Sequence, residues 1–301
     1  MLKTSFGVFL ILLLLTQFLA IGQPIDLHQR SFGLGPTNLY LQHPAYLGSE
    51  GFAILEVGNL TNSGAFSKVR TYYAFGGIAL SKREKSAHGH LGAFLYNESV
   101  GDFIQRPRGY LNYAWHIKLN STFTLGAGAR FGFVNYTFPS SDVSPGGSAT
   151  APDGSIGLWL QSERTRLGLS SLQILNSKII PIDLTFRYPR SYNLFASCKI
   201  PLSVSSSLTP YTQVNIKPTQ INSDYDVGVL LNLNDYIFFG PNFRNQRSVS
   251  FIFMVNNIVL TKMGYFNIKF AYNHPIISRT RIEIQSVEIC LGMLFKKQED
   301  E

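Results

Sequence analysis

Residues 50–295 contain a series of segments, each about ten residues long, in which apolar and polar side chains alternate. The last segment has one apolar side, formed by Val287, Ile289, Leu291, Met293 and Phe295. Its other side holds smaller or polar residues, Ser286, Glu288, Cys290 and Gly292. A period of two with one fully apolar face suits a strand between lipid and a polar lumen. The pattern predicts an all-β fold, a transmembrane antiparallel β-barrel.

The composition agrees with a surface that faces lipid. Charged residues make up 15% of the chain and aromatic residues 13%, which is a poor solvent-facing surface and a good lipid-facing one. Lys and Arg number 26 against 18 Asp and Glu. A basic balance can indicate nucleic-acid binding, but exported strands favour basic residues that line a lumen or face anionic headgroups. We therefore expect outer-membrane lipid as a partner and no nucleic acid.

Residues 1–22 have the features of a secretory signal peptide. Lys3 supplies the positive start, residues 6–19 form the apolar run, and Ala20-Ile21-Gly22 is a small-x-small cleavage site. An N-terminal membrane helix is the alternative, since the run approaches a spanning length of roughly 18 residues. Pro24 and polar residues follow at once, which favours cleavage.

The rest of the chain divides into three parts. Residues 23–49 are irregular and contain Gly33, Gly35, Pro36 and Pro44; we expect them on the periplasmic side or inside the barrel. Residues 50–295 form the outer-membrane β-barrel, and residues 296–301 form a charged C-terminal tail.

About fourteen strands are predicted, an even number as bacterial single-chain barrels require. Their centres fall near Leu55, Phe75, Ala93, Tyr113, Ala127, Leu158, Leu169, Ala196, Tyr211, Val229, Phe238, Phe253, Phe270 and Ile289.

The connections between these strands alternate in length. Four are short, at Asn120-Ser121, Glu163-Arg164, Asn234-Asp235 and Thr261-Lys262, whereas three are long, at 135–154, 173–189 and 273–281. Outer-membrane barrels have short periplasmic turns and long outer loops, so both termini are predicted to be periplasmic. Residues 81–89 are the exception, a longer periplasmic turn with a solvated charge run.

The two faces of the strands differ in composition. Leu111, Tyr113, Trp115 and Ile117, then Phe123, Leu125, Ala127, Ala129 and Phe131, are outward and uncharged. Several inward positions are Gly or Ala, which leaves lumen space for a plug or a narrow channel. Cys198 falls on an apolar register and Cys290 on a polar one. Side chains on opposite faces of a wall cannot form a disulfide.

No motif for catalysis or cofactor binding is complete. His88 and His90 share one side of a strand and could begin a metal site, but without a recognisable third ligand we interpret them as a solvated turn pair. His28, His43, His116 and His274 are interpreted as isolated. Inward His116 beside Asn112 is the one start of a hydrolase set. We therefore predict no catalytic residues, no metal and no cofactor.

An ordered series of motifs resembles a known family. His43-Pro44-Ala45-Tyr46-Leu47-Gly48-Ser49 resembles the N-P-A-F/Y-A-G-S motif of the PorP/SprF family, outer-membrane proteins of the type IX secretion and gliding machinery of Bacteroidota. The stretch that contains Asp153 is similar to the family's entry into a mid-barrel strand, and the stretch with Gly168, Leu169 and Ser170 to its G-L-S-x-x-Q-L-x-N motif. His43 replaces the family's usual asparagine and Leu47 its alanine.

The resemblance implies a non-enzymatic barrel in the cell outer membrane. Its role would be to help secreted proteins or adhesins reach or stay at the cell surface, with other type IX secretion components as partners and adhesin-like proteins as cargo. A diffusion porin or small-solute transporter is the alternative. A lumen filled by residues 23–49 favours the first function, and a wide polar lumen with constriction charges favours the second.

Overall fold

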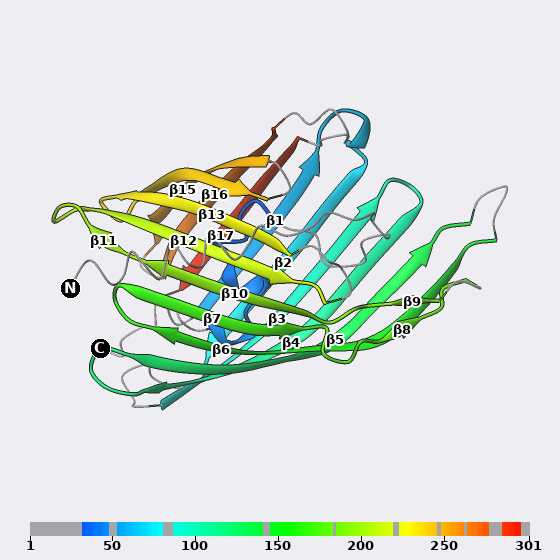
Figure 1. Ribbon diagram of the computed structural model, residues 1–301, viewed down its shortest axis with the longest axis horizontal. Coiled ribbons are helices and arrows are strands. Elements are labelled where there is room, and N and C mark those ends of the chain that lie inside the picture. The colour runs from blue at the N-terminus through cyan, green and yellow to red at the C-terminus, as the bar shows by residue number, and fades with distance from the viewer. Residues whose placement is uncertain are drawn as a thin grey trace.

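A computed structural model describes residues 32–47, 53–80, 87–140, 145–182, 185–218, 223–245, 248–261, 264–276 and 285–295. Within these residues, fourteen antiparallel strands form one closed barrel (Figure 1). They are β1 (Ala53–Asn62), β2 (Val69–Ala79), β3 (Ala87–Val100), β4 (Ile104–Lys118), β5 (Thr124–Phe138), β6 (Gly147–Gln161), β7 (Thr165–Leu172), β10 (Ser191–Cys198), β12 (Ser206–Ile216), β13 (Asp224–Leu233), β14 (Ile237–Arg244), β15 (Ser248–Thr261), β16 (Gly264–Pro275) and β17 (Ser286–Phe295).

The barrel closes because its first and last strands pair. β1 is hydrogen-bonded to β17 with Ala53 opposite Phe295, and each remaining strand pairs with its neighbour along the chain, including β10 with β12. β11 (Ile200–Pro201) prolongs β10 beside β12. All fourteen predicted strand centres fall inside these strands. The prediction of a barrel of about fourteen strands is confirmed.

The two ends of the barrel are named by the chain. The base is the end at which β1 begins and β17 ends, and the rim is the opposite end. The longest connection between barrel strands in the described chain, between β7 and β10, lies at the rim and contains the small hairpin of β8 (Lys178–Ile179) and β9 (Phe186–Arg187). Figure 1 shows this hairpin alongside the rim half of β6, which it contacts through β8.

Three predicted connections are wrong in extent; in one of them, 273–281, the strand β16 continues to Pro275. Residues 135–154 are not one long loop, because β5 continues to Phe138 and β6 begins at Gly147. The Asn135 amide donates to the Thr150 hydroxyl at 2.8 Å, and such cross-strand pairs stabilise a strand despite its Gly and Ser content. Residues 81–89 are likewise shorter as a turn, since β3 begins at Ala87.

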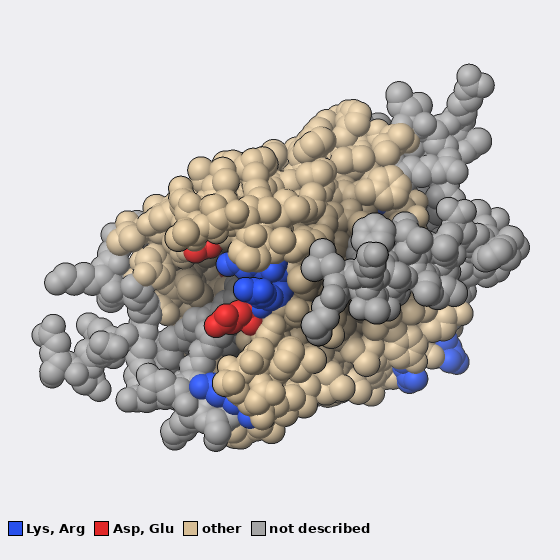
Figure 2. All heavy atoms as spheres, turned by 60° about the vertical axis from the view of Figure 1, so that its left-hand side comes forward, with Lys and Arg blue, Asp and Glu red and all other residues tan. Residues whose placement is uncertain are grey.

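The wall alternates between lipid and lumen as its sequence predicts. Leu111 and Phe131 on the outside are 68% and 66% exposed, whereas their inward neighbours Asn112 and Arg130 are 0% and 4% exposed. On the face drawn in Figure 2 most of the surface carries no charged side chain. Lys, Arg, Asp and Glu gather in a central hollow, with further Lys or Arg at the lower left and lower right edges. Of the two cysteines, both free, Cys198 is exposed and Cys290 is buried.

Residues 32–47, here called the lumen segment, lie inside the barrel (Figure 1). They contain two short 3-10 helices, η1 (Leu39–Leu41) and η2 (Pro44–Tyr46), and nearly all their side chains are buried. Another such helix, η3 (Gly64–Phe66), lies between β1 and β2. No helix in the described ranges is long and apolar enough to cross a membrane.

Glycines in the wall make room for the lumen segment. A Cβ atom on Gly128 of β5 would lie 2.5 Å from the backbone nitrogen of Ala45, and one on Gly77 of β2 would lie 2.5 Å from a Leu47 methyl group. Because real Cβ atoms do not approach backbone this closely, the segment fits against β5 only where the side chain is absent. The lumen segment therefore packs against the small inward residues of the wall, such as Gly128 and Gly77.

Candidate functional site

The contacts between the lumen segment and the wall form the candidate functional site. The first group centres on Lys269 of β16, whose Nζ lies 2.7 Å from Glu56 Oε1 of β1 and donates to Asn38 Oδ1 at 2.7 Å. The Tyr40 hydroxyl donates to the other oxygen of Glu56. Burial and the nearby carboxylate of Glu56 raise the pKa of Tyr40 well above its usual value, so Tyr40 remains a donor at neutral pH.

A second carboxylate extends this network along the wall. Glu288 of β17 accepts from the Leu34 backbone N–H at 2.9 Å and from the Tyr73 hydroxyl at 2.9 Å. Tyr73 accepts in turn from the Asn38 amide at 3.0 Å. Glu56 and Glu288 are 1% and 0% exposed. Buried carboxylates need such hydrogen-bond partners. The lumen segment supplies some of these partners to Glu56 and Glu288 of the wall.

Two arginines hold backbone carbonyls of the segment. Arg130 of β5 donates to the carbonyl oxygens of Leu41, at 3.1 Å, and Tyr40. Arg244 of β14 donates to the Phe32 carbonyl at 2.6 Å and forms an ion pair with Asp226 at 2.8 Å. A planar guanidinium with several donors suits such paired contacts. The described start of the segment is thus tied to one side of the barrel and its middle to another.

Three polar side chains of the wall donate to the backbone carbonyl oxygens of residues 42, 44 and 45 of the lumen segment. Ser170 of β7 donates to the Gln42 carbonyl at 2.9 Å, Asn112 of β4 to the Pro44 carbonyl at 3.1 Å, and His116 Nε2 to the Ala45 carbonyl at 2.9 Å. These bonds satisfy backbone acceptors that would otherwise be buried without partners. They also fix the register of the segment against β4 and β7.

His43 lies in an aromatic pocket of the wall. Its ring centroid lies 5.6 Å from that of Trp159 on β6 and 6.2 Å from that of Phe195 on β10. Tyr46 packs edge-on against the same indole at 4.8 Å. Burial, together with the charge of Arg130, lowers the pKa of His43 to about 3, so the imidazole is neutral at physiological pH.

The structure brings together most residues of the family-like motifs. His43, Pro44, Ala45 and Tyr46 lie in the lumen segment, where Ser170 contacts Gln42. A Cβ on Gly168 would lie 3.0 Å from His43 Cε1, so this glycine makes room for the imidazole. Leu169 is not part of the site, because it points outward and is 47% exposed. Gly48 and Ser49 lie outside the described residues.

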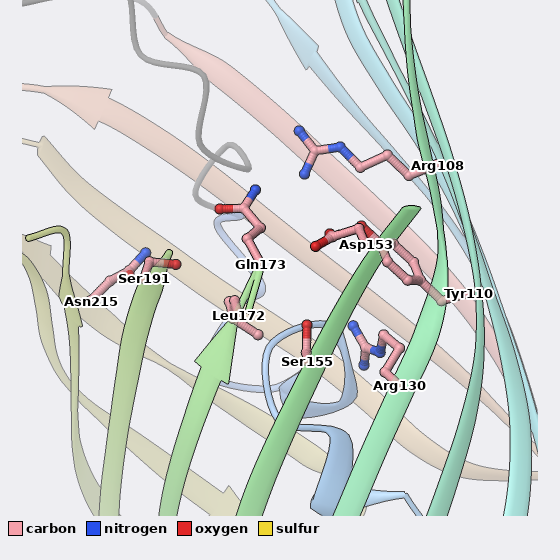
Figure 3. Close-up of a pocket in the computed structure, with 9 residues that line it drawn as sticks. All are labelled: Arg108, Tyr110, Arg130, Asp153, Ser155, Leu172, Gln173, Ser191 and Asn215. Carbon is pink, nitrogen blue, oxygen red and sulfur yellow. The ribbon is translucent and has the colours of Figure 1, made fainter. Parts of the chain in front are cut away.

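Asp153 lies on the rim side of the segment. It is 2% exposed and accepts from the Tyr110 hydroxyl at 2.7 Å. Both residues line a cavity of about 20 Å3, enough for roughly one water molecule. Figure 3 shows the lining side chains, with Arg130 directed towards the ribbon of the lumen segment. The other lining residues are Arg108, Ser155, Leu172, Gln173, Ser191 and Asn215.

His88 and His90 do not form a solvated turn pair, and His116 is not isolated. They are 3%, 1% and 1% exposed and face the lumen side by side, because β3 begins at Ala87 and His88 pairs with His116 in register. The prediction missed the cross-strand neighbour because register between strands could not be assigned from one sequence.

Sequence reasoning named Asn112 only as the inward neighbour of His116, and it missed the other wall residues that hold the segment, Glu56, Arg130, Arg244, Lys269 and Glu288. They do carry a signal, because each is a charged or amide side chain on the inward register of a membrane strand. Such residues are costly to bury without partners and mark functional contacts. What the sequence alone could not provide is the partner, which comes from residues far away along the chain.

Comparisons with known proteins agree with this fold. The family model described as type IX secretion system membrane protein PorP/SprF matches residues 36–293. No curated protein matches the chain.

Several solved structures share the fold at low sequence identity. The Ralstonia pickettii toluene transporter TbuX has a TM-score of 0.55 at 11% identity, covering 88% of this chain and 95% of that one. The monoaromatic hydrocarbon channel CymD has a TM-score of 0.55 at 13% identity, with 89% and 95% covered. A deletion mutant of the monoaromatic hydrocarbon channel TodX has a TM-score of 0.52 at 12% identity, with 86% and 94% covered. At these identities the likeness concerns the fold alone.

Proposed function

The chain belongs to the PorP/SprF family of type IX secretion system membrane proteins, and on that premise we propose that it works as a plugged scaffold for secretion. It is a multi-pass β-barrel of the outer membrane. In this role it assists the delivery or retention of secreted proteins, adhesins among them, at the cell surface. The observation that carries the proposal is the lumen segment, which occupies the barrel interior and is bonded to the wall.

The charges of the described lumen support a scaffold over a diffusion porin. A porin needs a hydrated path with charged side chains at its constriction. Here Lys269 pairs with Glu56, Arg244 pairs with Asp226, and Arg130 binds carbonyl oxygens of the lumen segment. These charged side chains form ion pairs with one another or hydrogen bonds to the lumen segment. The cavity beside Asp153 has room for about one water molecule.

The proposed partners divide between the two ends of the barrel. Short base turns, such as residues 162–164 and 234–236, are typical of a periplasmic face, where other secretion components would dock. The connection between β7 and β10 with its β8–β9 hairpin would face outward and meet the secreted cargo. In a gliding organism, adhesins held there would contribute to motility.

A deletion strain tests the proposed function. Surface-shaved proteomes of parent, deletion and complemented strains should show loss and recovery of a specific secreted or adhesin-like protein, while uptake of small solutes remains unchanged. A porin would give the reverse, with lost solute uptake and an unchanged surface proteome. The second result would overturn the proposal.

A further inference from the structure

Three histidines of the wall, His88, His90 and His116, form a cluster inside the barrel, next to the point where His116 binds the lumen segment. His88 and His90 are alternate residues of β3 and point to the same side, and His116 lies on the neighbouring strand β4 as the register partner of His88. Each imidazole offers a nitrogen, and the three offered atoms all lie within 4.8 Å of one another. We propose that His88, His90 and His116 bind a divalent first-row transition-metal ion, zinc in the first place.

The geometry is close to that of a loaded site. The His88 and His116 rings are stacked with centroids 5.3 Å apart, and the His90 ring stands nearly perpendicular to them, at 5.1 and 5.5 Å. In a tetrahedral zinc site with Zn–N bonds of about 2.1 Å, adjacent nitrogens are about 3.4 Å apart. Rotation of the side chains on a fixed backbone can supply the remaining contraction of about 1.4 Å or less.

The second observation is the hydrogen bond that orients His116. Its Nε2 lies 2.9 Å from the Ala45 carbonyl oxygen, which can only accept, so Nε2 carries the proton. In a neutral imidazole the lone pair is then on Nδ1, so Nδ1 is the nitrogen of His116 that can coordinate a metal. Metal-binding histidines commonly donate their other N–H to a backbone carbonyl, which fixes tautomer and ring orientation. Ala45 belongs to the lumen segment, so the site and the segment share this residue.

The surroundings keep space for the rings. Gly126 of β5 stands opposite His116 in register, and a Cβ atom there would lie 2.6 Å from His116 Cδ2. Any other residue at position 126 would displace the imidazole. Since His88 and His90 are the second and fourth residues of β3, the cluster lies near the base, about 10 Å or less along the strand from its end. An ion would therefore reach it from that end.

The ligand chemistry selects the class of metal. Within the described chain the cluster consists of three imidazoles without a carboxylate or thiol. Imidazole suits zinc, copper, nickel and iron, whereas magnesium and calcium require oxygen ligands. A bound ion would link β3 to β4 and, through His116, stiffen the attachment of the lumen segment at Ala45.

Zinc titration of the purified full-length barrel tests the site, with competition against a chromophoric zinc indicator. One saturable site is expected in the wild type, and His88→Gln and His90→Gln should each weaken zinc binding at least tenfold. His274→Gln, which alters an exposed histidine of β16, is the matched control and should bind as the wild type does. His116 is left unchanged because it also holds the lumen segment.

Cobalt(II) supplies a second readout that does not depend on affinity. Wild-type barrel loaded with cobalt should show the intense visible absorption of a four-coordinate site with three nitrogen ligands, and the His88→Gln/His90→Gln double variant should lose it while its heat-modifiable gel shift persists. Zinc should also raise the temperature at which the wild-type barrel loses this shift. Absence of saturable zinc binding in the wild type, or equal affinity in the double variant, would overturn the proposal.

Discussion

The Nζ atom of Lys269 on β16 lies 2.7 Å from Oε1 of Glu56 on β1, with both side chains almost fully buried. The pair spans the intervening strand β17 and also binds the lumen segment, because Lys269 donates to Asn38 and Glu56 accepts from Tyr40. The wall and the segment are therefore parts of one polar network.

Removing one charge of this pair should destabilise the barrel strongly. In Lys269→Met the Glu56 carboxylate stays buried without its cation, which costs roughly 3–5 kcal/mol. Urea unfolding of the protein in lipid vesicles measures the difference. Lys68→Met is the control, because its ion pair with Asp102 is exposed and is worth about 1 kcal/mol or less. Equal losses in the two variants would contradict the role of the Lys269 pair.

A methyl group on Gly128 should loosen the lumen segment while leaving the wall intact. The added Cβ would lie 2.5 Å from the backbone of Pro44 and Ala45, so Gly128→Ala must displace η2. Limited proteolysis with thermolysin should then cut within residues 32–47 in the variant and spare the wild type. In Gly76→Ala, the control, the nearest atom is a Leu55 methyl at 3.7 Å, and the segment should stay protected. If the lumen segment is protected from thermolysin in both variants, the close contact between Gly128 and the segment is contradicted.

Protonation of His43 should make the barrel less stable as the pH falls. Burial lowers the pKa of this imidazole to about 3, against about 6.5 when unfolded. The unfolded state then binds more protons between these values, so stability is full above pH 6.5 and decreases as pH falls. The loss from His43 between pH 6.5 and 5 is about 2 kcal/mol. His43→Asn should reduce this pH dependence of the unfolding free energy, and an unchanged slope would refute the assignment.

Impermeant thiol labelling of intact cells tests the orientation of the barrel. In a background of Cys198→Ala and Cys290→Ser, a cysteine at Ser148, exposed near the rim, should react, whereas one at Ser121 in a base turn should not. This follows from the longest connection lying at the rim. Labelling of position 121 alone would show that the barrel has the opposite orientation. Labelling after cell lysis is the control that both cysteines can react.

The fold was predictable because membrane strands obey a period of two over many residues. Leu111 and Asn112 alternate between lipid and lumen, and no knowledge of their neighbours is needed to assign them. The loop at 135–154 was predicted too long for the opposite reason. Its Gly, Ser and Pro content is typical of a turn, and only pairing with the opposite strand, as between Asn135 and Thr150, shows it to be sheet.

The site was less predictable because its contacts join distant residues. Nothing local indicates that Lys269 meets Asn38 or that His116 meets Ala45. The grouping of His88 with His116 depends on the register of β3 against β4, which a single sequence does not define. The motif around Pro44 could be recognised as a family resemblance, but its place against Gly128 required the barrel in three dimensions.

Planar-bilayer conductance of the purified protein is the most direct test of the claim that the lumen segment closes the barrel to ions. The account predicts that the wild type shows no steady open-pore conductance, whereas a variant that lacks residues 32–47 conducts ions when inserted as a folded, heat-modifiable barrel. The deletion removes the bonds from Arg130, Asn112 and Lys269 to the segment and leaves the wall strands unchanged. A wild-type conductance equal to that of the deletion variant would contradict a plugged scaffold and support a diffusion pore.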